Sequence, residues 1–465
     1  MSISRRPSRQ SRLSSRVALK GSPPNRQPRS PNRQMNKPAL EDWLQHLENL
    51  HPQEMELGLE RVRSVAVDLA LLPPPCPVIT VAGTNGKGST VAVLESLLHR
   101  AGKRAGCFTS PHFLRFNERI RVAGQEASDQ EICAAFSAIE AARGDTSLTY
   151  FEFATLAALL VFRDRDVDVA VLEVGLGGRL DSSNIVDPSV AVITSIDLDH
   201  QAWLGDDRNT IAREKAGIMR PGTPVVIADL DPPPALQACA EALGAAPVML
   251  AGREFSWREE ADKWSGQICG TDGKLHDVSG SANGLLPANI CAALQAASSL
   301  GIEWSPAQLQ DILADVRVVG RRQWVELDGR RYLLDVAHNP AAIHKMLEIV
   351  DASACNGKVI ALFSAMKDKP VAEMVALCGE RFDAWFVAEQ PDNIRAAGAA
   401  DLADALRHAG QTRISESKNL RQAFRRAQAL MAEGDMLIVF GSFFTVAAVV
   451  PLLEKDRNKS EAPKR

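Results

Sequence analysis

Eight consecutive residues constrain the fold of this chain more than any other stretch: Gly83, Thr84, Asn85, Gly86, Lys87, Gly88, Ser89 and Thr90. They follow a short apolar run at 77–81 and precede a helical pattern at 91–98, so we expect them to join a strand to a helix. Glycines let backbone N–H groups turn towards a phosphate, and the helix N-terminus adds partial positive charge. Lys87 would reach phosphate oxygens, and a hydroxyl after the turn can approach Mg²⁺. The spacing departs from the standard phosphate loop, but a phosphate site is favoured over a glycine-rich turn that binds nothing.

The sequence after this loop alternates between strand-like and helix-like patterns. Apolar runs at 167–174, 190–196 and 224–228 indicate buried parallel strands, and a helical pattern lies at 210–219. Residues 252–283, with glycines and alternating polarity, predict a small β excursion. This alternation predicts an α/β protein built on a doubly wound sheet.

A second α/β series begins near Arg321, after two predicted helices at 288–300 and 306–316. Its strands are expected at 331–336, 359–363, 384–388 and 436–440. We place the domain boundary near Val318–Gly320. The predicted domains therefore cover residues 38–318 and 319–456.

The net charge is unevenly distributed. The chain has 53 Lys and Arg against 57 Asp and Glu, a formal net charge of −4. Residues 1–37 hold ten of the basic residues and none of the acidic ones, which leaves 43 against 57, or −14, for the remainder. Nonspecific nucleic-acid binding needs a positive face, so no nucleic-acid partner is expected. Residues 1–37, rich in Ser, Arg and Pro, predict a disordered basic tail, and residues 457–465 a second disordered tail.

Two further features bear on location. No apolar run approaches the ~20 residues that cross a bilayer, so no membrane association is expected. Eight cysteines are scattered without a CxxC pair, which indicates reduced thiols rather than a zinc site or a disulfide framework. A cytoplasmic location follows from that redox state.

Polar residues follow two of the predicted strands. Glu173 ends one apolar run and His200 comes just after the next. The carboxyl ends of parallel strands are where open α/β sheets bind their ligands, so both should lie near the phosphate loop. From its own segment, a metal-ligand role for Glu173 is no better supported than a surface loop. Lys215 lies in a helical pattern and is expected by default to be a solvated surface charge, since an ammonium would repel Mg²⁺.

Ten short sequence motifs occur in order along both predicted domains: VAGTNGKGST at 81–90, TSPH at 109–112, FNERIRV at 116–122, TYFEF at 149–153, EVGLGGRLD at 173–181, DLDH at 197–200, REKAGI at 213–218, GRRQ at 320–323, DVAHNP at 335–340 and GSFFTVA at 441–447. Together they resemble the dihydrofolate synthase/folylpolyglutamate synthase family, a branch of the Mur ligases. The resemblance runs from about residue 39 to about residue 453. It implies a Mur-ligase-like α/β fold, with an N-terminal phosphate-loop ATPase domain on a parallel sheet and a smaller Rossmann-like C-terminal domain.

The resemblance also implies roles for particular residues. The whole of 83–90 would bind ATP, with further nucleotide contacts from Asn289, Arg321, Asp335 and His338. The implied ligands of two Mg²⁺ ions are Ser110, Glu173, His200 and Lys215. Lys215 would first be carbamylated by CO₂, which turns a cation into an anionic oxygen ligand. The implied catalytic set is Lys87, Glu173, His200 and Lys215, and a pterin pocket would include Phe151 and Asp181.

The implied chemistry is ATP-dependent ligation. The γ-phosphoryl group of ATP passes to a substrate carboxylate, and L-glutamate then displaces phosphate from the acyl phosphate to form an amide. A bifunctional enzyme would extend 7,8-dihydropteroate to dihydrofolate and reduced folates to folylpolyglutamates. The alternatives are a monofunctional folylpolyglutamate synthase and an inactive nucleotide-binding module. A Mur enzyme of peptidoglycan synthesis is disfavoured by the short segment at 38–82. A monomer is the simplest expectation.

Overall fold

An eight-stranded sheet carries the phosphate loop in the computed structural model, which describes residues 39–51, 56–260, 263–281 and 283–460. The strand order is β4-β3-β2-β5-β1-β6-β7-β8. The strands are β1 Val78–Ala82, β2 Ala105–Phe108, β3 Ile120–Val122, β4 Gln125–Glu126, β5 Val169–Glu173, β6 Val190–Ile193, β7 Val225–Ile227 and β8 Val248–Leu250. The six strands from β2 to β8 in this order pair in parallel, and β3 and β4 form an antiparallel edge. The predicted parallel α/β sheet is thus confirmed.

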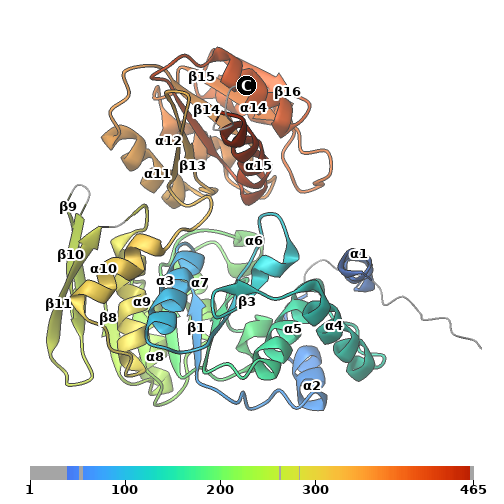
Figure 1. Cartoon of the computed structure of the whole chain (residues 1–465), viewed down its shortest axis with the longest axis vertical. Helices are drawn as coiled ribbons and strands as arrows, with labels where there is room; N and C mark the ends of the chain where they lie inside the picture. The colour runs from blue at the N-terminus through green and yellow to red at the C-terminus, as the bar shows by residue number, and fades with distance from the viewer. Residues whose placement is uncertain (1–38, 52–55, 261–262, 282, 461–465) are drawn as a thin grey trace, which may run out of the picture. The chain divides into compact units, whose positions relative to one another are not determined.

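Helices cover both faces of this sheet (Figure 1). One face packs on α1 Leu40–Leu50, α2 Glu60–Asp68, α4 Asp129–Arg143 and α5 Tyr150–Asp164. The other packs on α3 Lys87–Arg100, α9 Pro287–Ser299 and α10 Pro306–Asp315. A further cluster, with α6 Gln201–Leu204, α7 Arg208–Ala216 and α8 Pro234–Leu243, lies on the first face, because the β6 residues Ala191 and Ile193 that join it alternate with Val190 and Val192 of the opposite face. Two 3₁₀ turns, η1 Phe116–Arg119 and η2 Ser182–Ile185, complete this part. In β5, Ala170 and Leu172 face the first cluster, whereas Val169 and Val171 face the second. Burial on both faces explains why such strands read as continuous apolar runs.

The predicted β excursion is a three-stranded antiparallel sheet of β9 Ser256–Glu260, β10 Lys263–Cys269 and β11 Leu275–Ser281. Trp264 of β10 lies opposite Gly280 of β11 and is only 1% exposed. It belongs to the same apolar cluster as α9, and with Ile268 it attaches the small sheet to the main body.

A six-stranded sheet forms the C-terminal part, in the order β12-β13-β17-β14-β15-β16. Its strands are β12 Gln323–Leu327, β13 Arg330–Leu334, β14 Val359–Phe363, β15 Ala384–Ala388, β16 Ile414–Ser417 and β17 Met436–Phe440. Only β12 pairs antiparallel. Its helices are α11 Pro340–Ala352, α12 Val371–Cys378, α13 Ala399–His408, α14 Leu420–Leu430 and α15 Phe443–Ser460. The smaller second α/β sheet is confirmed.

The predicted tail from residue 457 is wrong as far as Ser460, because α15 continues to that residue. Asp456 in its last turns is hydrogen-bonded by Gln428 at 3.3 Å and by Arg425, both on α14. These contacts attach the end of α15 to the body. The basic tail at 1–37 and residues 461–465 lie outside the described residues. Within the described ranges no helix combines the length and apolar character that crossing a membrane requires.

Candidate active site

The loop between β1 and α3 adopts the geometry that its glycines predict. Gly83 and Gly86 have φ angles of +149° and +92°, where a side chain is disfavoured. An added Cβ would lie 1.9 Å from the Thr194 hydroxyl at Gly83 and 2.2 Å from the Asn289 amide oxygen at Gly86. The ammonium of Lys87 donates to the Gly83 carbonyl at 2.9 Å. The tight turn leaves Lys87 and the first N–H groups of α3 available to an anion.

Three predicted ligands lie at the carboxyl ends of strands around β1. Ser110 follows β2, Glu173 is the last residue of β5, and His200 follows β6. The Ser110 backbone N–H donates to the Glu173 carboxylate at 3.1 Å. Burial raises the pKa of Glu173, and the Lys87 ammonium opposes that shift. Burial lowers the pKa of His200 to about 4, so its imidazole is neutral at pH 7 and can act as a ligand.

Lys215 is buried against the phosphate loop. It lies on α7, is 4% exposed, and donates to the Gly83 carbonyl at 3.0 Å. Burial, together with the positive charge of Lys87, lowers its pKa from 10.5 to about 7. The default expectation of a solvated surface charge is therefore wrong. The lowered pKa makes the uncharged amine available near neutral pH.

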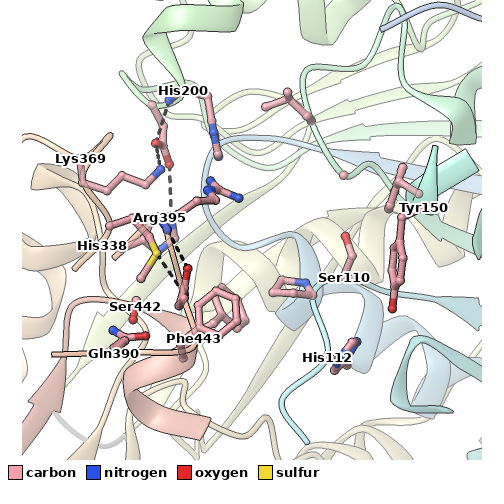
Figure 2. A pocket seen from close by; sticks show the side chains of 18 of the residues that line it. Ser110, His112, Tyr150, His200, His338, Lys369, Gln390, Arg395, Ser442 and Phe443 are labelled. Carbon is pink, nitrogen blue, oxygen red and sulfur yellow. Dashed lines mark hydrogen bonds and ion pairs between the residues drawn. The ribbon is translucent and has the colours of Figure 1, made fainter. Parts of the chain in front are cut away.

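These residues face a cavity of about 1410 Å³ that both parts of the chain line. The predicted residues that line it are Gly83, Thr84, Asn85, Gly86, Lys87, Ser110, Phe151, Glu173, His200, Lys215, Arg321 and His338. Figure 2 shows His338, Lys369, Gln390 and Ser442 from the C-terminal part on one side, and Ser110, Tyr150 and His112 on the other. The cavity therefore lies where two substrates could be brought together by the two sheets.

Arg321 and His338 enter the cavity from the C-terminal part. The Arg321 guanidinium lies 5.1 Å from the centre of the Phe443 ring, a cation–π distance. His338 Nδ1 lies 2.8 Å from the Val336 carbonyl oxygen, and its Nε2 lies 3.3 Å from an Asp199 carboxylate oxygen. These contacts fix the guanidinium and the imidazole at the edge of the phosphate loop.

Six predicted residues do not line the cavity: Gly88, Ser89, Thr90, Asp181, Asn289 and Asp335. Asn289 lies directly behind Gly86. The Asp181 carboxylate accepts hydrogen bonds from the Leu176 and Ser183 N–H groups, both at 2.9 Å. The Asp335 carboxylate accepts from the Ala337 N–H of its own loop at 2.8 Å and from the Arg322 N–H, just before β12, at 3.0 Å. In this structure both carboxylates hold loops that shape the cavity wall.

Several residues that line the cavity were not predicted from the sequence, namely Asp199, Lys369, His112, Arg119, Tyr150, Gln390, Arg395, Ser442 and Phe443. Most lie inside motifs that carry the family resemblance, such as DLDH, TSPH and TYFEF. Lys369 belongs to the phrase Met366-Lys-Asp-Lys369, to which no role was assigned. Charge and spacing alone do not indicate which C-terminal loops reach the phosphate loop.

The donors in the cavity fit a metal ion that arrives with a nucleotide. Ser110 offers a hydroxyl, Glu173 a carboxylate and His200 a neutral imidazole. Across the described part of the chain, no cluster of three or more His, Cys, Asp or Glu side chains is arranged to hold a metal. Mg²⁺ commonly takes one or two carboxylates and completes its six positions with phosphate oxygens and water. A partial donor set beside a phosphate loop suits that mode of binding.

The charge of the cavity differs from that of the chain. Seven Lys and Arg side chains line it against five Asp and Glu, whereas the sequence after residue 37 carries a net charge of −14. A locally positive cavity in an acidic body attracts anions without making the whole surface basic.

The fold and site define a Mur ligase. The Mur ligase middle domain matches residues 81–254, and the Mur ligase glutamate ligase domain matches residues 320–443. A dihydrofolate synthase/folylpolyglutamate synthase of Escherichia coli is 41% identical over 420 residues, which cover 90% of this chain and 96% of that protein. The chain belongs to the dihydrofolate synthase/folylpolyglutamate synthase family.

Solved structures agree with this assignment. Escherichia coli FolC in complex with DHPP and ADP superposes with a TM-score of 0.84 at 40% identity, covering 90% of this chain and 99% of that one. A bifunctional folylpolyglutamate synthase/dihydrofolate synthase with Mn, AMPPNP and L-glutamate bound has a TM-score of 0.82 at 40% identity, covering 90% and 98%. Both similarities extend over the N-terminal and C-terminal sheets.

Proposed function

We propose that this protein is a bifunctional ATP-dependent ligase that adds L-glutamate to 7,8-dihydropteroate and to reduced folates. One observation carries the proposal: a phosphate loop, a buried carboxylate and cationic C-terminal residues face the same cavity. The 41% identity to an enzyme of both names, over nearly the full length of each chain, supports the pair of activities.

The reaction requires positioning and charge neutralisation more than covalent help from the protein. The substrate carboxylate attacks the γ-phosphorus of ATP, ADP leaves, and an acyl phosphate forms. The glutamate amine then attacks the acyl carbon, and the C–O bond to phosphate breaks as the amide forms and the amine loses a proton. Lys87 and the N–H groups of α3 would hold the phosphates, and Arg321 would lie beside the transferring group.

We assign further nucleotide contacts to Asn289, Asp335 and His338, and a pterin pocket to Phe151 and Asp181. Phe151 supports this assignment because its ring lines the cavity and packs 5.5 Å from the Phe108 ring. Asp181 would act by holding the loop at Leu176, and Asn289 by backing the turn at Gly86. We place the boundary between the two domains at residues 318 and 319.

Ser110, Glu173 and His200 would hold Mg²⁺, which supplies positive charge to the phosphates when bound; two ions are proposed. We also propose that Lys215 is carbamylated. Its uncharged amine would form a bond to the carbon of CO₂ and release a proton, leaving an anionic carbamate. Burial and the lowered pKa of Lys215 support this step, because only the uncharged amine reacts. A cytoplasmic, monomeric enzyme is the simplest setting, in line with eight free cysteines.

The test is phosphate release by purified protein with ATP, Mg²⁺, bicarbonate and L-glutamate. Dihydropteroate and tetrahydrofolate are supplied separately, and product masses are checked. We expect glutamate-dependent release with both. Release with tetrahydrofolate alone would leave a monofunctional folylpolyglutamate synthase. No release with either substrate would favour an inactive nucleotide-binding module, and the proposal would fail.

A further inference from the structure

Asp199 of the N-terminal part is surrounded by side chains of the C-terminal part. Its carboxylate lies 2.5 Å from the Lys369 ammonium and 3.3 Å from His338 Nε2. The Asn339 side-chain amide donates to it at 3.1 Å. Within the N-terminal part, the carboxylate accepts from the His200 backbone N–H at 2.8 Å. One carboxylate thus joins three residues from two C-terminal loops to His200, a proposed metal ligand.

The principal ion pair of this cluster is almost completely removed from water. The side chains of Asp199 and Lys369 are 7% and 5% exposed. Figure 2 shows Lys369 and His338 reaching from the C-terminal side towards the segment of His200, with dashed lines marking the contacts. A buried ion pair gains much of its energy only when both charges are present, and removing one leaves the other desolvated and uncompensated. The ion pair between Asp199 and Lys369 therefore stabilises only the conformation in which the N-terminal and C-terminal parts are in contact.

A second contact connects the same cluster to the phosphate loop. Asn339 donates to the Asn85 side-chain oxygen at 3.1 Å, and Asn85 donates back to Asn339 at 3.3 Å. The Asn339 oxygen also accepts from the Ala342 N–H at 2.9 Å and so caps α11. One asparagine therefore joins the phosphate loop, Asp199 and the start of a C-terminal helix. These contacts position the C-terminal part relative to the phosphate loop.

We propose that Asp199 anchors a latch, formed with Lys369, His338 and Asn339, that keeps the C-terminal part closed over the phosphate loop while the acyl phosphate exists. The proposal rests on the proposed ligase function. Water could otherwise attack the acyl carbon in place of glutamate, break its bond to phosphate and return the carboxylate. One ATP would then be spent without an amide. Exclusion of water from such an intermediate is a general function of closed active sites. Lys369 and Asp199 are positioning residues in this scheme.

The first test needs no catalysis. Lys369→Met keeps the length of the side chain but removes its charge, and small-angle scattering of the protein without ligands reports how open it is. We expect a larger radius of gyration than in the wild type. Lys345→Met is the matched control, because Lys345 is 56% exposed and pairs only locally with Glu348. Its scattering should match the wild type. Unchanged scattering in both Lys369→Met and Asp199→Asn would overturn the latch.

The second test counts phosphate released per amide formed. We expect a ratio near one for the wild type and for Lys345→Met, and a rise of roughly threefold for Lys369→Met as water competes with glutamate. Lys369→Arg keeps the charge and should restore the ratio. If Lys369→Met slows amide formation while the ratio stays at one, the latch is overturned and Lys369 serves glutamate binding alone. A wild type that releases no phosphate would refute the ligase function, while the scattering would still decide the latch. Melting temperatures identify a variant that fails to fold.

Discussion

Lys215 illustrates how its surroundings change what a side chain can do. A lysine in a helical pattern is usually a surface charge, but this one is buried against the Gly83 carbonyl beside a second ammonium. Burial and the nearby positive charge of Lys87 both disfavour the charged form of Lys215. The proposed carbamate would convert a site of cation repulsion into one that attracts Mg²⁺.

The substitution Lys215→Ala tests the carbamate. We expect turnover to fall roughly 100-fold or more, the usual cost of losing one preorganised electrostatic group. Phosphate release at saturating ATP, glutamate and folate measures it, and ATP binding by calorimetry reports whether the phosphate loop is intact. Lys345→Ala, at an exposed lysine, should retain turnover. Full activity in Lys215→Ala would refute the carbamate assignment.

Phe151→Ala tests the pterin pocket. The ring lines the cavity and lies against Gly175, where an added Cβ would come within 2.6 Å of it. Losing an aromatic contact worth roughly 2 kcal/mol should lower kcat/KM for dihydropteroate about 30-fold. The KM for ATP should not change, since Phe151 is not among the proposed nucleotide contacts. An equal loss for ATP would indicate a general disturbance and contradict the assignment.

The sequence predicted those site residues whose role follows from backbone geometry. Glycines at a strand–helix junction predict a phosphate loop, and Gly83 and Gly86 have the positive φ angles this requires. The position of Glu173 at a strand end was also predictable. The interaction of Asp199 with Lys369 was not, because 170 residues separate them and no local pattern sets which C-terminal loop reaches the cavity.

At the scale of elements, long buried segments were predicted well. The expected strands at 359–363, 384–388 and 436–440 coincide with β14, β15 and β17, since full burial makes them continuous apolar runs. The short strands β2, β3, β4, β8, β12 and β16 were missed. They have two to five residues and, apart from the buried β2, partly exposed patterns, so their sequences carry little periodicity.

Helix α4 offers a pH-dependent prediction about stability. Glu131 accepts hydrogen bonds from Arg165 at 2.6 Å and from the Ser128 backbone N–H at 2.8 Å. The Arg165 hydrogen bond lowers the pKa of Glu131 from 4.5 to about 2. A lowered carboxyl pKa stabilises the folded state fully above pH 4.5, and the contribution is lost as the pH falls towards 2.

Glu131→Gln should therefore lower the free energy of unfolding at pH 7 by roughly 1 kcal/mol, a modest value because the pair is partly exposed. The difference from the wild type should be smaller at pH 3.5. Urea unfolding followed by circular dichroism at both pH values measures it. An equal difference at the two pH values would show that Glu131 acts through its shape rather than its charge.

At the scale of the whole chain, the two sheets differ in what they bring to the reaction. The N-terminal sheet provides the phosphate loop and the proposed metal ligands at the carboxyl ends of its strands. The C-terminal sheet provides nitrogen-bearing side chains from loops that also follow its strands, including the imidazole of His338 after β13 and the ammonium of Lys369 after β14. Each sheet presents the edge at which α/β folds bind ligands. Neither sheet provides all the residues of the proposed site. The segment that links the two parts should therefore affect activity.

Gly320 lies at that connection. Its φ angle is +63°, and an added Cβ would lie 2.9 Å from Val446 and 3.0 Å from Val336 in the C-terminal part, and 3.1 Å from Phe113 in the N-terminal part. Gly320→Ala therefore adds backbone strain and also pushes against side chains of both parts. We expect glutamate-dependent turnover to fall at least about tenfold, while ATP binding to the phosphate loop changes little.

Gly301→Ala separates the two causes. Gly301 has a similar φ angle of +72° but no atom within 4 Å of an added Cβ. Its substitution introduces the strain, roughly 1 kcal/mol, without the crowding. If both variants lose the same stability and Gly301→Ala keeps its turnover, the loss in Gly320→Ala comes from displacement of one part against the other. If turnover in Gly320→Ala is normal, the connection tolerates that displacement, and the position of the C-terminal part must be set by its contacts across the cavity instead.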